Sequence, residues 1–235
     1  MSGWILHQTH ARVTVATHPT TNSKTGDMIQ VWILGTQDTP LTLSRQGRDS
    51  VVCGQCPKRH SLQGDCYVNI WQAPQAVYHA WRNGVYGTLR TFQADGRHKR
   101  VPIRWGAYGD PAFIPYVLLA RLSDQSIGWT GYTHQWQQPH ALRYARYLMA
   151  SCDTPEQAEL AQSQGWRTFR TRYAGSPLTG EITCPASLEA GHKTDCSRCQ
   201  LCDGNSSVST FVDPRKSITI LAHGARSQHL IRIGE

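Results

Sequence analysis

The cysteines constrain the fold of this chain more than any other feature, because seven of its eight cysteines fall into two groups. The first group reads Cys-x2-Cys-x9-Cys and the second reads Cys-x11-Cys-x2-Cys-x2-Cys. A spacing of two residues lets a tight turn point both thiolates at one centre. The pattern therefore predicts two metal centres. Their ligands are Cys53, Cys56 and Cys66 in the first group, and Cys184, Cys196, Cys199 and Cys202 in the second.

The spacing leaves the metal open between iron and zinc. The close triple 196–202 with a remote fourth cysteine matches the run that wraps a four-iron cluster, although Asp203 stands where ferredoxins usually have Pro. Zinc would take four thiolates in a tetrahedral structural site. The first group has three cysteines, which leaves one metal position open unless His60, Cys152 or a cysteine of the second group fills it. We favour iron–sulfur clusters, of the 4Fe-4S type, with zinc as the alternative.

Composition and the N-terminus indicate the compartment and the kind of partner. The first residues lack the basic and apolar regions of a signal peptide, and no apolar run approaches the ~20 residues of a membrane span. We therefore expect a cytoplasmic protein whose thiols stay reduced, not a disulfide framework. The chain has 24 Lys and Arg against 16 Asp and Glu, a net charge of +8, with a basic run at 97–104. Such a surplus makes nucleic acid or a nucleotide a plausible partner.

Apolar runs alternate with helix signals through most of the chain. Thr154, Pro155 and Gly165 bracket the clearest helix as N-cap, first residue and C-terminal stop. The expected strands are 28–34, 101–105, 126–130, 147–150, 166–171 and 217–222, and the expected helices are 67–83, 111–122, 139–146 and 155–164. Such alternation implies right-handed crossovers between parallel strands.

The expected fold class is therefore α/β, with a parallel sheet or a partial (β/α) barrel and a C-terminal cysteine-cluster module. We expect residues 1–180 to form the partial barrel with the N-terminal cysteine loop. Residues 181–205 would form the cysteine-cluster module, and residues 206–235 would return a strand to the same α/β domain.

Polar residues follow the expected strands at their carboxyl ends, where functional groups gather in such sheets and barrels. The acid/base candidates there are Asp110, His134 and Asp153. The candidates for binding a cofactor or substrate are Tyr108, Tyr132, Arg172 and His223. The two aspartates also suit helix N-caps, and the histidines also suit hydrogen-bonded loop positions. The role of the isolated Cys152 is open between ligand, catalytic thiol and filler.

Several motifs together resemble the "gene product 88"-type family of bacteriophage proteins, over about residues 22–224. They are Asn22-Ser-Lys-Thr-Gly26, the first cysteine loop ending in Cys66-Tyr67, Arg104-x3-Tyr108-Gly-Asp-Pro111, Gly131-Tyr-Thr-His134 and the C-terminal cysteine cluster. The resemblance implies a phage-encoded protein that acts in the host cytoplasm.

More loosely, the chain is similar to radical S-adenosylmethionine enzymes. Those are partial or full (β/α) barrels in which a three-cysteine loop holds a cubane cluster, and some carry further C-terminal cysteine clusters. This resemblance implies that the open iron of a cluster on the first group takes S-adenosylmethionine as a cofactor.

Three functions remain open from the sequence. The first is a phage-type iron–sulfur enzyme, radical-S-adenosylmethionine-like, that acts on a nucleobase, a nucleotide or a nucleic acid. The second is a basic nucleic-acid-binding protein whose metal clusters are structural. The third is a barrel-type glycosylase or base-exchange enzyme with an aspartate nucleophile, Asp110 or Asp153, and structural zinc.

Overall fold

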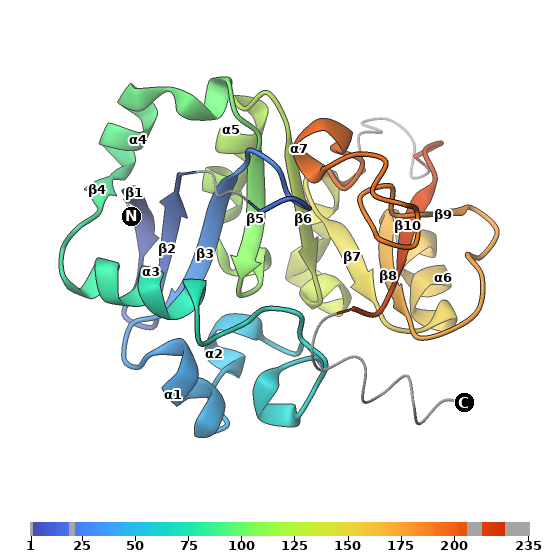
Figure 1. Cartoon of the computed structure of the whole chain (residues 1–235), viewed down its shortest axis with the longest axis horizontal. Coiled ribbons are helices and arrows are strands. Elements are labelled where there is room, and N and C mark those ends of the chain that lie inside the picture. Colours follow the sequence, from blue (N-terminus) through green and yellow to red (C-terminus); the bar gives the residue numbers. More distant parts are fainter. Residues whose placement is uncertain (1, 19–21, 206–212, 224–235) are drawn as a thin grey trace.

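The computed structural model describes residues 2–18, 22–205 and 213–223. Within these ranges ten strands form one sheet in the order β4-β1-β2-β3-β5-β6-β7-β8-β10-β9 (Figure 1). The strands are β1 (Gly3–Gln8), β2 (Arg12–Thr17), β3 (Ile29–Gly35), β4 (Gly87–Thr88), β5 (Ile103–Tyr108), β6 (Trp129–Thr133), β7 (Met149–Cys152), β8 (Thr168–Arg172), β9 (Glu181–Thr183) and β10 (Ser217–Leu221). The β1–β2 and β2–β3 pairs are antiparallel, and all other neighbours are parallel.

Short helices connect these strands. The α-helices are α1 (Pro40–Arg45), α2 (Ser50–Cys53), α3 (Ala73–Arg82), α4 (Leu89–Asp95), α5 (Tyr116–Asp124), α6 (Pro155–Ser163) and α7 (Cys196–Cys199). The 3₁₀ helices are η1 (His60–Leu62), η2 (Arg97–Lys99), η3 (Pro111–Phe113), η4 (Gln135–Gln137) and η5 (Pro139–Arg146). None of the helices in the described residues has the length and apolar character needed to cross a membrane.

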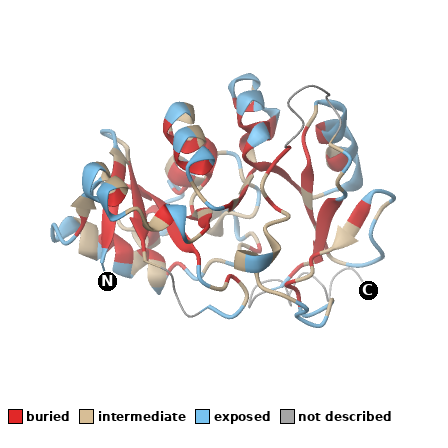
Figure 2. Ribbon diagram, turned by 90° about the horizontal axis from the view of Figure 1, so that it is seen from above, coloured by how far each residue is buried: buried red, intermediate tan, exposed pale blue. Residues whose placement is uncertain are grey.

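The parallel strands β3, β5, β6, β7 and β8 are neighbours in the same order as they occur in the chain. Right-handed crossovers in such a series place their helices on one face of the sheet. Trp105 of β5 belongs to this face, because its indole Nε1 donates to Ser123 Oγ of α5 at 3.0 Å. Figure 2 shows that burial is concentrated in the strands and in the sides of the helices that face them.

The opposite face of the parallel strands carries a cavity rather than a layer of helices. Arg104, Gly106 and Tyr108 alternate with the helix-facing residues of β5 and line this cavity. The segment 184–205 covers part of the same face, and its Cys184 and Cys202 join a second small core with Ile218 and other side chains of the sheet. The sheet thus separates a helical layer from a layer of cysteine-bearing loops.

The α/β class and the mostly parallel sheet are confirmed, and so are the cap and first residue of α6. The Thr154 hydroxyl accepts from Gln157 N at 3.2 Å, with Pro155 in the first turn. The strand expected at 217–222 is β10, whereas 206–212 and 224–235 of the expected returning segment lie outside the described residues. The antiparallel hairpin formed by β1 and β2 was not predicted from the sequence.

The single helix expected at 111–122 is wrong. Residues Pro111–Phe113 form only the 3₁₀ turn η3, and α5 begins at Tyr116. Ile114 between them is extended, with φ −76° and ψ 136°, because the ring of the following Pro115 disfavours a helical conformation there. The break lets Asp110 cap η3 while α5 takes its own direction.

Two further boundaries differ for local reasons. The expected helix 67–83 begins only at Ala73, since Asn69 Oδ1 accepts from Trp71 N at 3.1 Å and holds a turn before it. The strand expected at 126–130 is β6, which begins at Trp129 because Ser126 Oγ bonds to the backbone of Gly128. Residues 139–146 are helical as expected, but as the 3₁₀ helix η5.

Gly109 fixes how the carboxyl end of β5 meets β3 and α2. Its φ is +78°, and an added Cβ would lie 2.7 Å from both the Cβ and the carbonyl oxygen of Ile33. The next residue, Asp110, donates its N–H to Val52 O of α2 at 2.8 Å. Only glycine combines this backbone conformation with this close approach.

We predict that Gly109→Ala lowers the free energy of unfolding by roughly 2–4 kcal/mol, through backbone strain and a steric clash. Gly84→Ala is the matched control, because Gly84 has φ +68° but nothing within 4 Å of an added Cβ. The control should lose about 1 kcal/mol. Urea unfolding of both variants measures the difference, and equal losses would contradict the close approach.

Candidate functional site

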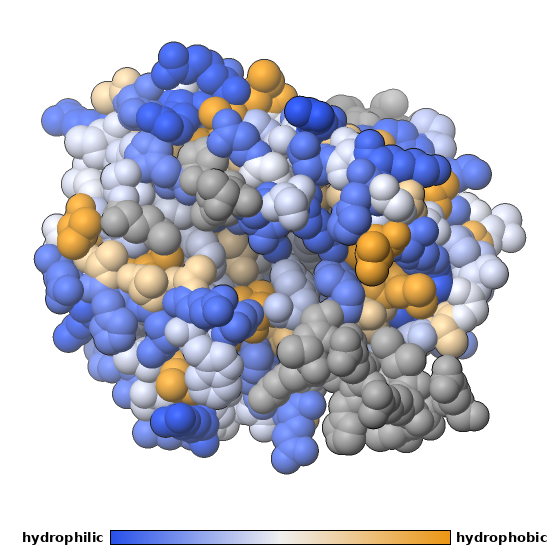
Figure 3. Space-filling view, in the orientation of Figure 1, coloured by the Kyte–Doolittle hydropathy of each residue, from blue (hydrophilic) through white to orange (hydrophobic). Residues whose placement is uncertain are grey.

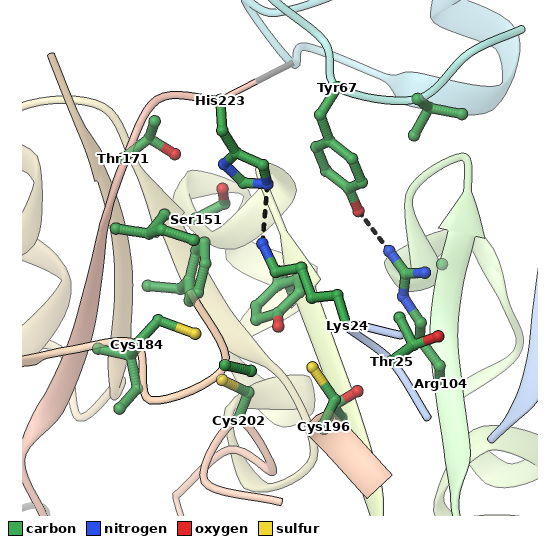
Figure 4. A pocket seen from close by; sticks show the side chains of 18 of the residues that line it. Lys24, Thr25, Tyr67, Arg104, Ser151, Thr171, Cys184, Cys196, Cys202 and His223 are labelled. Carbon is green, nitrogen blue, oxygen red and sulfur yellow. Dashed lines mark hydrogen bonds between the residues drawn. The ribbon is translucent and has the colours of Figure 1, made fainter. Parts of the chain in front are cut away.

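All seven grouped cysteines line one cavity of about 370 Å³ on the face of the parallel strands opposite α5. Figure 4 shows Cys184, Cys196 and Cys202 pointing toward one another at one end of it. The floor of the cavity is formed by strand residues that alternate along their strands and so point to the same side of the sheet. They are Arg104, Gly106, Tyr108, Thr130, Tyr132, Ser151, Phe169, Thr171, Ile218 and Ile220. The two cysteine groups, far apart in sequence, therefore face a common space.

The first cysteine group lies on a tight turn at the end of α2. Cys53 is the last residue of α2, and Cys56 N donates to Cys53 O at 3.2 Å. Gly54 between them has φ +58°, and an added Cβ would lie 2.3–2.5 Å from the amide group of Gln135. Cys66 returns to this turn because its N–H donates to Lys58 O at 3.0 Å. The local backbone thus brings all three cysteines of this loop to one wall of the cavity.

The second cysteine group is assembled by β9 and α7. Cys184 directly follows β9, and its N–H donates to Thr219 O of β10 at 2.8 Å. Asp195 caps α7 by accepting from Arg198 N at 3.1 Å, and Cys196 and Cys199 are the first and last residues of that helix. Cys202 follows a left-handed turn at Gln200.

Arg167 anchors the end of the second group to the sheet. It is 3% exposed, and its Nη1 donates to Leu201 O at 2.8 Å and to Gly204 O at 3.0 Å. Cys202 O in turn accepts from Gly131 N of β6 at 3.0 Å. These bonds hold the cysteine segment against the strands.

Burial, with mutual proximity adding to it, raises the pKa of the thiols of Cys53, Cys66, Cys184, Cys196 and Cys202. Burial raises the pKa of Cys66 and of Cys196 to about 11 each. Burial, with the neighbouring thiols adding to it, holds the pKa of Cys53 and Cys202 well above the ordinary value. A bound metal reverses this balance, because thiolate is the form that ligates and the metal charge stabilises it.

The donor set has the chemistry of a soft metal centre. Thiolates select iron–sulfur clusters, zinc or copper(I) over hard cations. The described residues nevertheless include no group of three or more Cys, His, Asp or Glu side chains already placed to hold one metal ion. What favours a thiolate-bound centre is thus the type of donor and the shared cavity, not a ligand arrangement already in place among the described side chains.

A buried polar network joins the first cysteine loop to the ends of β7 and β8. Lys58 Nζ lies 3.1 Å from Asp65 Oδ1, 3.2 Å from Asp153 Oδ1 and 3.2 Å from the Tyr173 hydroxyl. His134 Nε2 lies 3.2 Å from the other oxygen of Asp153. Burial lowers the pKa of His134, but Cys56 and Asp153 outweigh it and raise this pKa to about 10. The network thus places two cations and two carboxylates beside the first cysteine group.

Asp110 has all its oxygen atoms committed to neighbouring donors. Its Oδ1 accepts from Thr133 Oγ1 at 2.6 Å and from Ala112 N at 2.9 Å, and its Oδ2 accepts from His134 N at 2.9 Å. Burial raises its pKa despite these bonds. Asp110 therefore caps η3 and ties the carboxyl end of β5 to that of β6, as well as lining the cavity.

The other expected site residues divide into two sets. Tyr108, Tyr132 and His223 line the cavity together with His134, whereas Asp153 does not line it but contacts the lining residues His134 and Lys58. Arg172 lies outside the cavity, buried and ion-paired with Glu189. The structure therefore brings most of the expected strand-end residues together.

Cys152 lies on the opposite side of the sheet from the cavity. It is 0% exposed, belongs to the main hydrophobic core, and directs its thiol to Ala150 O at 3.6 Å. Burial raises its pKa to about 12. The structure thus gives Cys152 the position of a core side chain, away from both cysteine groups.

Sequence reasoning missed four cavity residues, which are Lys24, Thr25, Lys58 and Arg104. All four lie within the motifs named in the sequence analysis, but lysine, threonine and arginine have no ligand spacing of their own. Position within those motifs was the available signal.

No family model, curated protein or solved structure matches this chain. The assignment of the site therefore depends on its geometry.

We predict that Lys58→Met lowers the free energy of unfolding by about 3 kcal/mol, because it leaves Asp65 and Asp153 buried without their cation. Arg48→Met is the control, since Arg48 pairs with Asp38 on the surface with 52% of its side chain exposed. Its loss should stay below about 1 kcal/mol. Urea unfolding compares the variants, and a similar small loss in both would contradict the network.

Proposed function

We propose that this chain is an iron–sulfur enzyme built on a partial (β/α) barrel. The observation that carries the proposal is that seven cysteines line one cavity on the face of the consecutive parallel strands opposite α5. A partial barrel has its helices outside and its reaction space inside, at the carboxyl ends of its strands. Tyr108 and His134, at the ends of β5 and β6, line the cavity in keeping with that design.

The first cysteine group is the proposed reactive centre. Its three thiols would hold a cubane cluster and leave one iron open toward the cavity. Such a cluster supplies one-electron chemistry, and S-adenosylmethionine is the proposed cofactor for the open position. His134 and Lys58 supply positive charge beside these thiolates and so favour an anionic cluster there.

The second cysteine group is the proposed structural or electron-relay centre. It provides four thiols, enough to hold a four-iron cluster or a zinc ion without an open position. Because Arg167 and the bond from Gly131 N to Cys202 O fix this segment on the sheet, its centre would brace the cavity wall. Residues 181–205 are therefore the proposed cysteine-cluster module.

The chain's own residues can hold and move a proton at the cavity. His134 Nε2 shares a proton with Asp153, and this pair connects through Lys58 to Asp65. A substrate near Cys56 would meet the imidazole of His134, which is the proposed general acid or base. Asp110 is the proposed orienting residue, because its Oδ2 fixes the backbone of His134.

The substrate class that we propose is a nucleobase or nucleotide. The cavity floor pairs the rings of Tyr132 and Phe169, whose centroids are 4.3 Å apart, and the cations Lys24 and Arg104 also line the cavity. Aromatic rings accept a flat base and cations accept its phosphate. By its resemblance to phage proteins, we propose that the enzyme acts in the cytoplasm of an infected host.

Metal analysis after anaerobic purification tests the proposal. We predict a brown protein with about eight irons and about eight sulfides per chain, as expected for two four-iron clusters. Iron, sulfide and zinc are measured on the same sample. A colourless protein with stoichiometric zinc and no iron would contradict the iron–sulfur assignment.

Cysteine variants assign the two centres. Cys53→Ser and Cys196→Ser should each lower the iron content by about half, because each removes one ligand from a different cluster. Cys152→Ala is the matched control and should keep the full iron content, because its thiol lies in the core. Iron analysis with circular dichroism separates metal loss from unfolding. Equal iron loss in all three variants would contradict the assignment of the two cysteine groups to two separate clusters.

A further inference from the structure

The loop 22–26 places two side chains over the cavity beside the second cysteine group. Asn22 Oδ1 accepts from Lys24 N at 3.0 Å and from Thr25 N at 3.2 Å, which folds the loop into a tight turn. The loop docks on α7, because Cys196 N donates to Lys24 O at 3.0 Å and Ser197 N donates to Thr25 O at 3.1 Å. The backbone of α7 therefore fixes where Lys24 and Thr25 lie.

Gly26 makes this docking possible. Its φ is +63°, and an added Cβ would lie 2.6 Å from both Asp195 Oδ1 and Ser197 Oγ. The close approach explains the glycine at the end of the motif. It does not require a lysine or a threonine before it, so the side chains of Lys24 and Thr25 call for a separate explanation.

Thr25 has a buried hydroxyl that none of the described neighbours satisfies. The residue is 4% exposed and lines the cavity, and its Oγ1 has no hydrogen-bond partner within the described ranges. Leaving a buried hydroxyl unpaired is costly, whereas a valine of the same shape would avoid the cost. A ligand that reaches this hydroxyl would satisfy it.

Two cations flank the same part of the cavity without carboxylate partners. Among the described residues, neither Lys24 nor Arg104 forms an ion pair with a carboxylate. Lys24 Nζ contacts His223 Nε2 at 2.8 Å, and Arg104 Nη2 donates to the Tyr67 hydroxyl at 2.7 Å (Figure 4). Both partners are neutral acceptors, so the positive charge of both cations remains unbalanced by acidic side chains.

The acidic residues that line the cavity are occupied elsewhere. Asp65 is held by Lys58 and Tyr173, and Asp110 is held by hydrogen bonds at the ends of β5 and β6. The remaining anionic candidates near Lys24 are the thiols of the second group. Lys24 could therefore either bind an anionic ligand in the cavity or neutralise the thiolates of a metal centre, and these two roles need to be separated by experiment.

We propose that Lys24, Thr25 and Arg104 form a binding site for the phosphate group of a nucleotide. Lys24 and Arg104 would donate charged hydrogen bonds to its oxygens, and the Thr25 hydroxyl would donate a third. The base would lie on the apolar floor beside Tyr132 and Phe169. The site deepens the proposed function by naming the substrate class, but it needs no metal for its own binding.

Calorimetry on the full-length chain tests the site, with nucleoside 5′-monophosphates and the matching nucleosides as probes. At least one monophosphate should bind at least tenfold more tightly than its nucleoside, because the nucleoside lacks the anion. Lys24→Ala and Arg104→Ala should each weaken that binding by roughly tenfold to a hundredfold. Lys99→Ala is the matched control, since Lys99 is exposed on η2 and should leave the affinity unchanged.

Thr25→Val distinguishes a binding role from a structural one. It should weaken monophosphate binding but leave the thermal midpoint unchanged or higher, because the hydroxyl has no partner in the part of the chain that the structure describes. Equal affinities for nucleoside and monophosphate, or no binding of any monophosphate at millimolar concentration, would overturn the site.

Metal content separates this inference from the iron–sulfur proposal. Iron and zinc are measured on Lys24→Ala alongside the calorimetry. A variant that loses metal while its nucleotide affinity stays unchanged would assign Lys24 to the metal centre and overturn the phosphate site. A variant that loses nucleotide affinity but keeps its full metal content supports the phosphate site. This holds even if the metal is zinc, a result that would contradict the iron–sulfur proposal alone.

Discussion

The order of the parallel strands is the constraint on which the rest of this structure depends. Because β3, β5, β6, β7 and β8 are neighbours in chain order, right-handed crossovers put their helices on one face and leave the other face free. Loops from both halves of the chain cover that free face. Cysteines that are remote in sequence therefore line a common cavity, which no local pattern would bring about.

Buried cations hold the covering loops in place and set the electrostatics of the cavity. Lys58 ties the first cysteine loop to the ends of β7 and β8, and Arg167 ties the second group to the sheet. Lys24 and Arg104 face the space between the groups. The positive charge of these cations favours an anionic ligand in the cavity, which is the basis for proposing a thiolate-bound cluster and a phosphate there. On the face seen in Figure 3, groups of hydrophobic residues are scattered among hydrophilic ones.

The sequence predicted those features of the fold that depend on short-range signals, such as helix caps and the alternation of apolar runs with helices. The cap at Thr154 and the proline after it predicted α6, and alternating apolar strands with helices predicted the sheet. The split at Pro115 and the late start of β6 were not predicted, because turn chemistry overrides the apolar pattern at both places. The pairing of Arg170 with Glu181 was not predictable, because β9 joins the sheet through a contact that only the tertiary fold defines. Cysteine spacing predicted the two groups. It could not predict that both line one cavity, because that depends on the order of the strands in the sheet.

The central claim is that the two cysteine groups hold separate iron centres on opposite walls of one cavity. Anomalous diffraction at the iron absorption edge, from crystals grown without oxygen, tests it most directly. The account predicts two iron peaks, one bounded by Cys53, Cys56 and Cys66 and the other by Cys184, Cys196, Cys199 and Cys202. Disulfide bonds among these sulfurs, or anomalous signal at the zinc edge alone, would contradict it.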